Sequence, residues 1–457
     1  MKTRRNLILT YLLLSVSWLR AEVKVAEVFT SHMVLQQQKD VKVWGTADAG
    51  ETVMVSFGRQ KVRTTASADG KWQAVLKPMK ASAKPLVMTV RGRKNTIRLS
   101  DVLVGEVWLA SGQSNMEYTM KTKYARPKES RWSNYQEQAL SEAANPNIRL
   151  LHIEKNLKQD TLPTRGWQVC TPETVAPFSA AAYFFARMLQ DSLQVPVGII
   201  NTSWGGTKIE VWMPEKGDRW TRMVKPMAGY ALRGFLWYQG ETNLINGDID
   251  EYIPKMEKMV ADWRQAWNDE VLPFYYVQIS PMTYSHRKDY ADPKTWLDLP
   301  RFWTAQTECL RRIKHTGMVV TTDLPDDLDD IHPPYKWKVG ERLCLLALNR
   351  TYGHTQTECC GPVLESAKVE DGKAVLTFSH ADGGLITSDG KEPDWFYTNK
   401  TNGRCYKAKA FIDGNRVIVD LQPNVTHPII RFGYDEVGQP NLRNHAGLPA
   451  QPFEVKL

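Results

Sequence analysis

An alternation of apolar strands with helices, which begins near residue 101, constrains the fold more than any other feature. Residues 102–110 are almost continuously apolar, which is typical of a strand covered on both faces. Ser179 is a suitable N-cap for a helix that runs to about Leu193, and another apolar strand follows at residues 197–201. This β-α order predicts a three-layer α/β domain with a largely parallel sheet.

The same pattern continues towards residue 358. Its predicted elements are strands at 231–238, 274–279 and 318–322 and helices at 249–267 and 335–348. In the first of these helices the apolar residues recur at helical spacing on one face, which is the face that a helix packs against a sheet. We therefore assign residues 101–358 to the α/β domain.

Segments rich in short strands flank this domain. Their β-branched or alternating patterns lie at 41–44, 53–57 and 86–90 on one side and at 373–378 and 416–420 on the other. Turn sequences separate them. These patterns predict an N-terminal β-sandwich over residues 22–100 and a C-terminal β module over residues 359–457. A chain of 457 residues is long enough for three such parts.

The first residues have the composition of a signal peptide, which we place at residues 1–21. A basic start precedes an apolar run over residues 7–16, which is too short for a membrane-spanning helix. We expect cleavage after Ala21, with cleavage after Ser17 or an uncleaved anchor as alternatives. The expected product is a secreted protein, in the periplasm or outside the cell. No later stretch is long and apolar enough to cross a membrane.

Composition argues against two kinds of binding. The net charge of +9 comes from basic residues dispersed along the chain, without the Lys/Arg-rich block that a nucleic-acid groove needs. The six cysteines include no CxxC pair, so the pattern of a structural zinc site is missing. Buried free thiols are the simplest interpretation, and a bridge involving Cys359 or Cys360 is the alternative in an exported protein.

Four polar segments follow predicted strands, at the places where ligands bind in an open parallel sheet. The first is Ser111–Met116. A serine on a tight strand-to-helix turn exposes its hydroxyl beside backbone N–H groups that can stabilise an oxyanion, so Ser114 is a candidate nucleophile. Met116 stands where the α/β-hydrolase elbow G-x-S-x-G has its second glycine, so that family does not fit. As the alternative, Ser114 only caps the following helix.

The second and third segments supply further groups. Residues 201–207 contain paired glycines, and at Gly206 the backbone can approach a ligand and present an N–H, unless the segment is a plain turn. The third segment brings together Gln239, Glu241 and Asn243. Such groups are costly to bury without partners, so they line a site or form a structural hydrogen-bond network.

The fourth segment, residues 326–334, contains four aspartates before His332. A carboxylate close before a histidine can orient the ring and stabilise its imidazolium, which makes His332 a candidate general base. The alternatives are an acidic, solvated loop and a calcium site, since four aspartates could supply oxygen ligands. An EF-hand loop does not fit, because its glycine and its terminal glutamate are missing.

In chain order these segments resemble the four blocks of SGNH-type hydrolases. They are more closely similar to those of the sialate O-acetylesterase group, which also includes acetylxylan esterases. GQSNMEY, INTSWGGTKIEVW, GFLWYQGETN and DDIHP look like that group's signature blocks. FTSHMVLQQ, the DGKW turn and HAGLPAQPF resemble its flanking β modules. The resemblance covers nearly the whole chain after residue 21 and implies a three-layer SGNH-hydrolase-like domain between two β modules.

The resemblance also implies catalytic roles. Ser114 would attack the acetyl carbonyl, and His332 would take its proton and return it to the leaving sugar hydroxyl. Asp329, three positions before the histidine, would orient the ring. Asp330, which is nearer in the sequence, and Glu241 from the third segment are the alternatives.

An oxyanion hole is implied as well. The backbone N–H groups of Ser114 and Gly206 would line it. SGNH-type hydrolases complete the hole with an asparagine side chain, and here the third segment departs from that pattern. Gln239 is the preferred third donor, and Asn243 is the second choice.

The implied function is that of a secreted carbohydrate O-acetylesterase, in the first place a sialate O-acetylesterase, that works through an acetyl-serine. The partner would be an O-acetylated sugar or glycan, with acetylated xylan or another plant glycan as the alternative, and no metal or organic cofactor is implied. A non-catalytic carbohydrate-binding protein is the alternative of another class. It would use the β modules and some of the sixteen tryptophans but would leave the ordered polar segments without a role.

Overall fold

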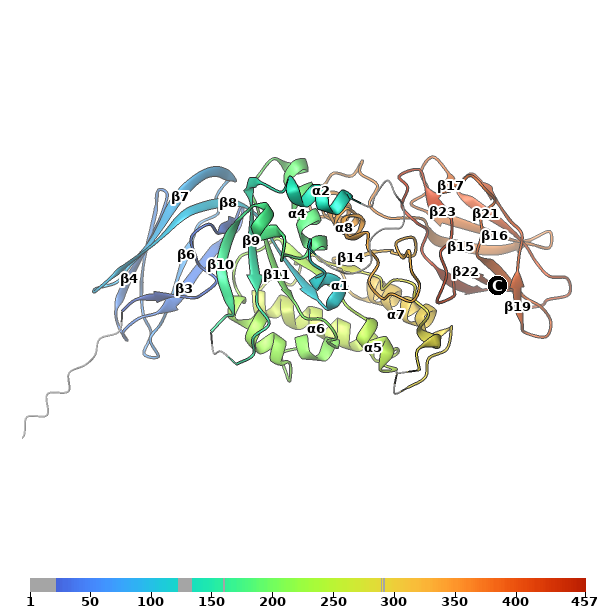
Figure 1. Cartoon of the computed structure of the whole chain (residues 1–457), viewed down its shortest axis with the longest axis horizontal. Coiled ribbons are helices and arrows are strands. Elements are labelled where there is room, and N and C mark those ends of the chain that lie inside the picture. Colours follow the sequence, from blue (N-terminus) through green and yellow to red (C-terminus); the bar gives the residue numbers. More distant parts are fainter. Residues whose placement is uncertain (1–21, 122–133, 159–160, 289, 291) are drawn as a thin grey trace, which may run out of the picture.

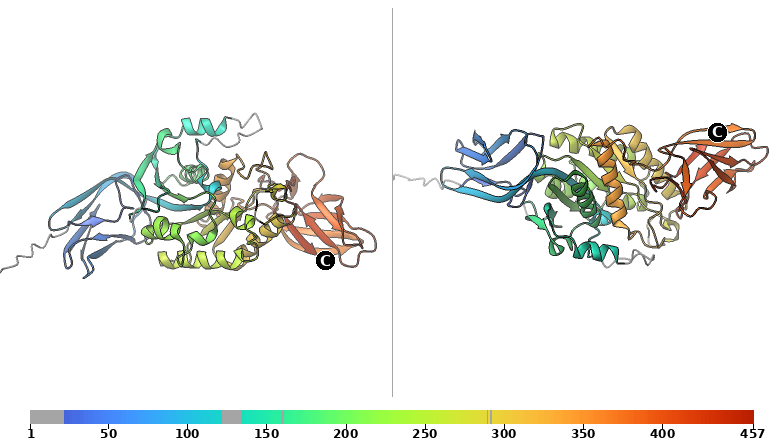
Figure 2. Two further views of the ribbon diagram at one scale, coloured as in Figure 1. Left: turned by 60° about the horizontal axis from the view of Figure 1, so that its bottom comes forward. Right: turned by 90° about the horizontal axis from the view of Figure 1, so that it is seen from above.

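A computed structural model describes residues 22–121, 134–158, 161–288, 290 and 292–457. Three parts follow one another along the long axis of the molecule: a group of strands, a central α/β part and a second group of strands (Figures 1 and 2). The chain passes through them in order from the N-terminal to the C-terminal side. The predicted signal peptide lies outside the described residues.

Short strands make up the N-terminal part. They are β1 (Lys24–Val25), β2 (Val34–Gln36), β3 (Val41–Thr46), β4 (Thr52–Phe57), β5 (Gln60–Thr65), β6 (Lys71–Leu76) and β7 (Ser82–Arg91). Strands β1, β3 and β6 form a three-stranded sheet, and β4, β5 and β7 join a larger sheet through the next strand, β8. The predictions of strands at 41–44, 53–57 and 86–90 are confirmed in β3, β4 and β7.

Strand β8 (Thr96–Gly112) has 17 residues and connects the N-terminal part to the central part. Its first half pairs with β7, antiparallel, and with β2, parallel. Its second half pairs in parallel with β11 and β12 of the central sheet. The boundary that the sequence placed between residues 100 and 101 therefore falls inside one continuous strand.

The central sheet has the order β10-β9-β11-β8-β12-β13-β14. Its other strands are β9 (Asn145–Ile153), β10 (Thr164–Cys170), β11 (Val197–Ser203), β12 (Gly234–Tyr238), β13 (Phe274–Val277) and β14 (Thr316–Val319). All neighbours are parallel from β9 to β14, and only β10 on β9 is antiparallel. The sequence did not predict β9 and β10, which lie at one end of the strand order; the antiparallel β10 makes the sheet mixed.

Helices cover both faces of the central sheet, and each face has its own apolar core. Helices α4 (Ala180–Leu193) and α8 (Lys336–Arg350) pack in one core, and α6 (Tyr252–Trp267) and α7 (Asp298–Arg312) pack in the other. From Val107 to Ala110 the side chains of β8 alternate between the two cores, which explains why this part of the strand is apolar on both faces. Helix α7 was not predicted.

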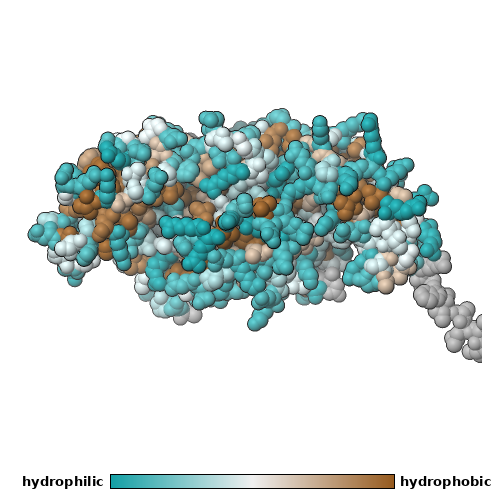
Figure 3. Space-filling view, turned by 180° about the vertical axis from the view of Figure 1, so that it is seen from behind, coloured by the Kyte–Doolittle hydropathy of each residue, from teal (hydrophilic) through white to brown (hydrophobic). Residues whose placement is uncertain are grey.

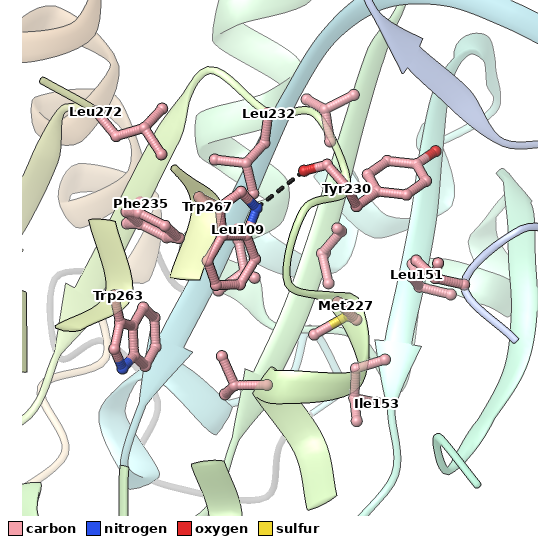
Figure 4. Close-up of a cluster of buried hydrophobic side chains, with 14 of the residues drawn as sticks. Leu109, Leu151, Ile153, Met227, Tyr230, Leu232, Phe235, Trp263, Trp267 and Leu272 are labelled. Carbon is pink, nitrogen blue, oxygen red and sulfur yellow. Dashed lines mark hydrogen bonds between the residues drawn. The ribbon is translucent and has the colours of Figure 1, made fainter. Parts of the chain in front are cut away.

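Figure 4 shows part of the core that contains α6 and α7, where the Trp267 indole donates to the carbonyl oxygen of Tyr230 at 2.9 Å. In the first core, Ser179 caps α4 as predicted, since its side chain accepts a hydrogen bond from the Ala182 N–H at 3.2 Å. Most tryptophans of the described residues are buried in such cores. The high tryptophan count is therefore mainly a property of the packing.

The remaining short elements connect these layers. They are α1 (Ser114–Glu117), α2 (Tyr135–Ser141), α3 (Pro172–Val175), η2 (Ile209–Trp212), η3 (Trp220–Val224), η4 (Lys225–Met227), α5 (Glu241–Ile245) and η5 (Tyr284–His286). Helices α1 and α5 follow the sheet strands β8 and β12 directly, so they lie at the carboxyl ends of those strands.

The C-terminal part consists of strands around a third apolar core. They are β15 (Val363–Glu370), β16 (Lys373–Ser379), β17 (Leu385–Thr387), β18 (Phe396–Asn399), β19 (Cys405–Lys407), β20 (Ala410–Asp413), β21 (Arg416–Asp420), β22 (Ile429–Phe432), β23 (Leu442–Asn444) and β24 (Phe453–Lys456). The predicted strands at 373–378 and 416–420 are confirmed in β16 and β21, which pair with each other.

Polar contacts fasten the C-terminal part to loops of the central part. The Glu436 carbonyl oxygen accepts from the Met282 N–H at 3.0 Å, and the Glu436 carboxylate accepts from the Ser285 N–H at 2.9 Å. The Arg443 guanidinium donates to Asp323 at 2.8 Å, and Arg342 of α8 donates to both oxygens of the same carboxylate. The Asp323 side chain is 9% exposed, so this is a buried ionic cluster at the junction.

Polar residues dominate the face of the molecule in Figure 3, and apolar residues gather there in small groups. Within the described residues, no helix combines the length and the apolar composition that a membrane crossing requires.

We expect Asp323→Asn to lower the free energy of unfolding at pH 7 by about 3 kcal/mol, because it leaves the buried guanidinium of Arg342 and the partly exposed one of Arg443 without their carboxylate. Burial opposes ionisation, but Arg342 and Arg443 lower the pKa of Asp323 to about 2. The contribution of this carboxylate is therefore complete above pH 4 and disappears as the pH falls towards 2. Urea unfolding followed by tryptophan fluorescence measures it. The exposed Asp382→Asn is the control, and equal stability of Asp323→Asn and wild type at pH 7 contradicts the prediction.

Candidate active site

The sequence-predicted loops meet at one edge of the central sheet. Gly112 at the end of β8 pairs with Ser203 at the end of β11 and with Tyr238 at the end of β12. Because these three parallel strands end at the same level, the residues that follow them are neighbours. The fourth loop follows β14 and leads into α8.

Ser114 is the first residue of the short helix α1 and is half-buried. At this position the backbone N–H has no partner within the helix. Among the described residues, neither this N–H nor the Ser114 hydroxyl has a hydrogen-bond partner. The residue thus combines an uncommitted hydroxyl with an uncommitted backbone donor.

Gly205 and Gly206 lie beside Ser114. A Cβ atom at position 205 would lie 3.2 Å from the Ser114 Cβ, so a glycine there lets the two loops approach closely without a tight contact. Gly206 has a φ of 71°, which disfavours other residues, and the space around its Cα is open. Within the described part of the chain its N–H has no acceptor either. Two backbone donors thus stand free at this edge.

Gln239 and Asn243 are completely buried, and their amide groups are occupied. The Gln239 amide nitrogen lies 2.7 Å from Asn243 Oδ1, 3.1 Å from the Thr207 carbonyl oxygen and 3.2 Å from Gln113 Oε1. The Asn243 amide nitrogen donates to Asp248 at 2.8 Å. The structure does not bring either predicted donor to the site with a free N–H. It uses both amides to connect the first, second and third loops.

A buried cluster connects the Ser114 loop to the His332 loop. The Asn115 amide donates to Glu241 Oε1 at 2.6 Å and to the Ile331 carbonyl oxygen at 3.0 Å. Lys336 Nζ donates to Asn115 Oδ1 at 2.8 Å and to the Pro333 carbonyl oxygen at 2.6 Å. Asn115, Glu241 and Lys336 are each at most 1% exposed. Glu241, which the sequence offered as an alternative residue to orient His332, is buried and accepts a hydrogen bond from Asn115 instead.

His332 is held by Asp330. Its Nδ1 lies 3.1 Å from Asp330 Oδ1, and its backbone N–H donates to the same oxygen at 2.9 Å. The imidazole is 15% exposed. No direct hydrogen bond joins Ser114 to His332 among the described residues. Catalytic hydrogen bonds of ligand-free enzymes are often formed only when substrate is bound.

The first choice for the orienting carboxylate, Asp329, has another partner. Its Oδ1 accepts a hydrogen bond from the Thr283 hydroxyl at 2.5 Å. The turn closed by the Asp330 side chain on the His332 N–H places the carboxylate of Asp330 at the ring, and Asp329 then points towards residue 283. The geometry therefore favours Asp330, the alternative, over the spacing of three that favoured Asp329.

The buried surroundings shift the pKa values of two groups. Burial and the nearby charge of Lys336 lower the pKa of His332, and Asp330 opposes this shift in part. Burial also lowers the pKa of Lys336, to about 7, although Glu241 and Asp330 favour its charged form. A histidine with a lowered pKa is neutral at neutral pH and can accept a proton.

Several residues of the site were not predicted. Glu117 accepts from the Gly205 N–H at 2.6 Å and pairs with Lys155, and so connects the first loop to the second. Gln113, Asn115 and Glu117 could have been found as polar residues inside the first motif. Lys336 had no signal in the sequence, because a lysine at the start of a helix usually indicates exposure.

The calcium alternative can be compared with the structure. Among the described residues, no group of three or more His, Cys, Asp or Glu side chains is arranged to hold a metal ion. The aspartates of the fourth loop have separate partners instead, for example Thr283 for Asp329 and the Tyr335 hydroxyl for Asp326.

The chain was compared with known protein families. Residues 104–347, more than half of the chain, match the family described as "Carbohydrate esterase, sialic acid-specific acetylesterase". The chain belongs to this family. The matched range includes all four loops of the site, from the strand before Ser114 to the helix after His332. Family membership makes the chain an esterase with a carbohydrate substrate.

Individual relatives agree with this assignment. The sialate O-acetylesterases of Pongo abelii and Homo sapiens are each 29% identical to the chain over 412 residues, covering 78% of this chain and 76% of their own. The crystal structure of a carbohydrate acetylesterase from Xanthomonas citri is 31% identical and superposes with a TM-score of 0.85. It covers 95% of this chain and 99% of its own, so the arrangement of all three parts is shared.

We expect Asp330→Asn to reduce kcat by about 10²- to 10⁴-fold, because an amide neither stabilises the imidazolium nor holds the required tautomer. Asp329→Asn keeps the contact to Thr283 and should cost less than tenfold. Steady-state hydrolysis of an acetyl ester by both variants decides between them. The reverse order of the two losses would return the orienting role to Asp329.

We expect Lys336→Met to move the acid limb of the kcat/KM profile to higher pH, by roughly one unit. The charge of Lys336 lowers the pKa of His332, so its removal raises that pKa and the base becomes protonated at a higher pH. The pH dependence of acetyl ester hydrolysis measures this limb. Lys338→Met on the same helix is the control, and an acid limb that does not move in Lys336→Met contradicts the assignment.

Proposed function

We propose that the chain is a secreted carbohydrate O-acetylesterase that hydrolyses acetyl esters of sugars through an acetyl-serine intermediate, with sialic acid as the carrier of the acetyl group. The observation that carries the mechanism is the meeting of an uncommitted Ser114, two free backbone donors and the His332–Asp330 pair at one edge of the sheet. Family membership supports the ester and the carbohydrate.

In the first half of the reaction, the Ser114 hydroxyl attacks the acetyl carbonyl carbon, and His332 accepts the hydroxyl proton. The oxyanion is stabilised by the N–H groups of Ser114 and Gly206, which need no reorganisation because no acceptor among the described residues uses them. His332 then donates its proton to the sugar oxygen, the C–O ester bond breaks, and the deacetylated sugar leaves. Each such donor contributes on the order of 10²–10³ in rate.

In the second half, His332 removes a proton from water, which attacks the acetyl-serine. The same two N–H groups stabilise the second oxyanion, and His332 returns the proton to Ser114 as acetate leaves. Asp330 orients the ring through Nδ1 in both halves. Gln239 and Asn243 act as braces that keep the glycine loop in place and do not complete the oxyanion hole.

We also propose that the central part is a three-layer SGNH-hydrolase-like domain. A parallel sheet with helices on both faces and polar loops at its carboxyl edge is the arrangement expected of a three-layer SGNH-hydrolase-like domain. The domain limits of 22–100, 101–358 and 359–457 divide the chain accordingly, with β8 continuous across the first limit. Residues 1–21 are the proposed signal peptide, and the N-terminus of the exported protein checks this.

The sugar is proposed from two observations. The curated relatives are sialate O-acetylesterases, whereas the similar structure from Xanthomonas citri is named only a carbohydrate acetylesterase. Sialic acid is therefore the first substrate to test, and acetylated xylan is the second. A non-catalytic carbohydrate-binding protein would release no acetate that depends on Ser114, so acetate release by wild type and Ser114→Ala distinguishes it from an esterase.

We expect the wild-type protein to release acetate from O-acetylated sialic acid faster than from acetylated xylan, and Ser114→Ala to reduce the release at least 10³-fold. Acetate is measured enzymatically under identical conditions. Ser192→Ala, at an exposed serine, is the matched control. Equal acetate release by Ser114→Ala and wild type would sink the mechanism, and faster release from xylan would replace the substrate.

A further inference from the structure

Two adjacent cysteines, Cys359 and Cys360, lie far from the Ser114 loop in the fold, between the end of α8 and the start of β15. They line a cavity of about 190 Å³ at the junction of the central and C-terminal parts. Its wall includes Met318 after the start of β14, Arg350 at the end of α8 and His380 after β16. The acetylesterase mechanism uses none of these groups.

The backbone holds both thiols on the same side of the chain. The N–H groups of Cys359 and Cys360 donate to one oxygen of Glu358, at 2.9 and 3.1 Å, and the Asn444 amide donates to the Cys360 carbonyl oxygen at 2.9 Å. The two sulfur atoms are 3.6 Å apart. A covalent S–S bond is about 2.05 Å long, so the two thiols are in contact and not bonded.

One arginine lies directly against this pair. The Arg350 guanidinium lies 3.2 Å from Cys360 Sγ and is itself anchored by a hydrogen bond to the Thr316 carbonyl oxygen at 2.8 Å. His380 lies next to the pair and contacts Glu358 through Nδ1 at 3.1 Å. The charged or titratable groups around the two thiols are Arg350 and Arg342 of α8, Tyr275 of β13, His380 of the C-terminal part and Glu358 of their own segment.

These contacts favour one thiolate shared by the two sulfurs. The hydrogen bond from Cys360 and the charge of Arg350 lower the pKa of Cys359, and that of Cys360 is raised by donating this bond. Three other cysteines differ sharply from the pair. Burial raises the pKa of Cys170 and of Cys309 to about 12, and it raises that of Cys344 still further.

We propose that Cys359 and Cys360 form a thiol–disulfide exchange site, which small organic disulfides convert to a vicinal disulfide. Both thiols line the cavity that admits the reagent; Cys359, the more buried of the two, is the attacking thiolate, and the half-buried Cys360 is the resolving thiol. The site is independent of the esterase reaction. It also fits the oxidising compartments that export would reach.

The exchange proceeds in two balanced steps. Cys359 Sγ attacks one sulfur of the disulfide RSSR, a bond forms between them, and the first thiolate RS⁻ leaves and takes up a proton. Cys360 Sγ then loses its proton to solvent and attacks Cys359 Sγ, and the second RS⁻ leaves. The two cysteines are oxidised by two electrons, and RSSR is reduced to two RSH. The product ring fixes the backbone of the segment that joins α8 to β15.

The test treats the reduced, folded protein at pH 7 with 2-hydroxyethyl disulfide, blocks the remaining thiols, and maps the cysteines by mass spectrometry of the peptides. We expect the peptide with Cys359 and Cys360 to be lighter by two hydrogen atoms and to carry no adduct. Cys170, Cys309 and Cys344 should stay reduced and unlabelled until the protein is unfolded. A 359–360 peptide that stays reduced, or one that retains a stable mixed disulfide, overturns the proposal.

Variants separate the two roles. In Cys360→Ser the mixed disulfide should accumulate on Cys359, and in Cys359→Ser the reaction at pH 7 should slow at least tenfold. Cys405→Ser, at the half-exposed cysteine of β19, is the control and should leave the exchange unchanged. Trapping of the adduct on position 360 instead of 359 contradicts the assigned order of attack.

The role of Arg350 is tested by the pH dependence of the reaction with iodoacetamide. In the wild type, labelling of Cys359 should have a midpoint clearly below the ordinary thiol value of about 8.5, and Arg350→Gln should move the midpoint up and slow labelling at pH 7 about tenfold. The wild-type profile stands alone if this variant does not fold. A wild-type midpoint at or above 8.5 contradicts the proposal.

Discussion

The parallel pairing of β8 with β11 and β12 is the constraint on which the rest of the structure depends. One strand of 17 residues belongs to the N-terminal sheet at its start and to the central sheet at its end. Its last residue, Gly112, pairs with the last residues of both neighbours, so three loops leave the sheet at one level. A shift of register by one residue would turn the side chains from Val107 to Ala110 to the opposite core and would displace Ser114 from the glycine loop.

Beneath the reacting groups, the active site is organised by buried polar contacts. Lys336 is the cation of the Asn115–Glu241–Lys336 cluster, and it links the Ser114 loop to the His332 loop. Such a cluster is costly to bury, and its members must all be present for the hydrogen bonds to compensate. The cluster explains how a site built from four separate loops keeps one geometry, and why its charge also tunes the histidine.

Much of this could be predicted from the sequence, and the failures have physical reasons. Strands and helices with a strong apolar period, such as 102–110 and 252–267, were found because their burial dictates the pattern. Strands β9 and β10 were missed, since polar residues interrupt their apolar pattern. Helix α7 was missed although Leu299, Phe302 and Trp303 give it an apolar face at helical spacing. Among site residues, Ser114 and His332 could be named from their loops. The choice of Asp330 over Asp329, and the burial of Gln239, depend on hydrogen bonds between loops that spacing does not reveal.

The contacts of Glu436 with Met282 and Ser285 have a mechanical consequence. Thr283, between these two residues, bonds Asp329 through its hydroxyl and the Leu328 carbonyl oxygen through its N–H. Through Glu436, between β22 and β23, the C-terminal part thus supports the loop that carries His332. Removal of the C-terminal part by proteolysis would take away these hydrogen bonds and would leave the His332 loop less firmly held, although no residue of the candidate site would be cut.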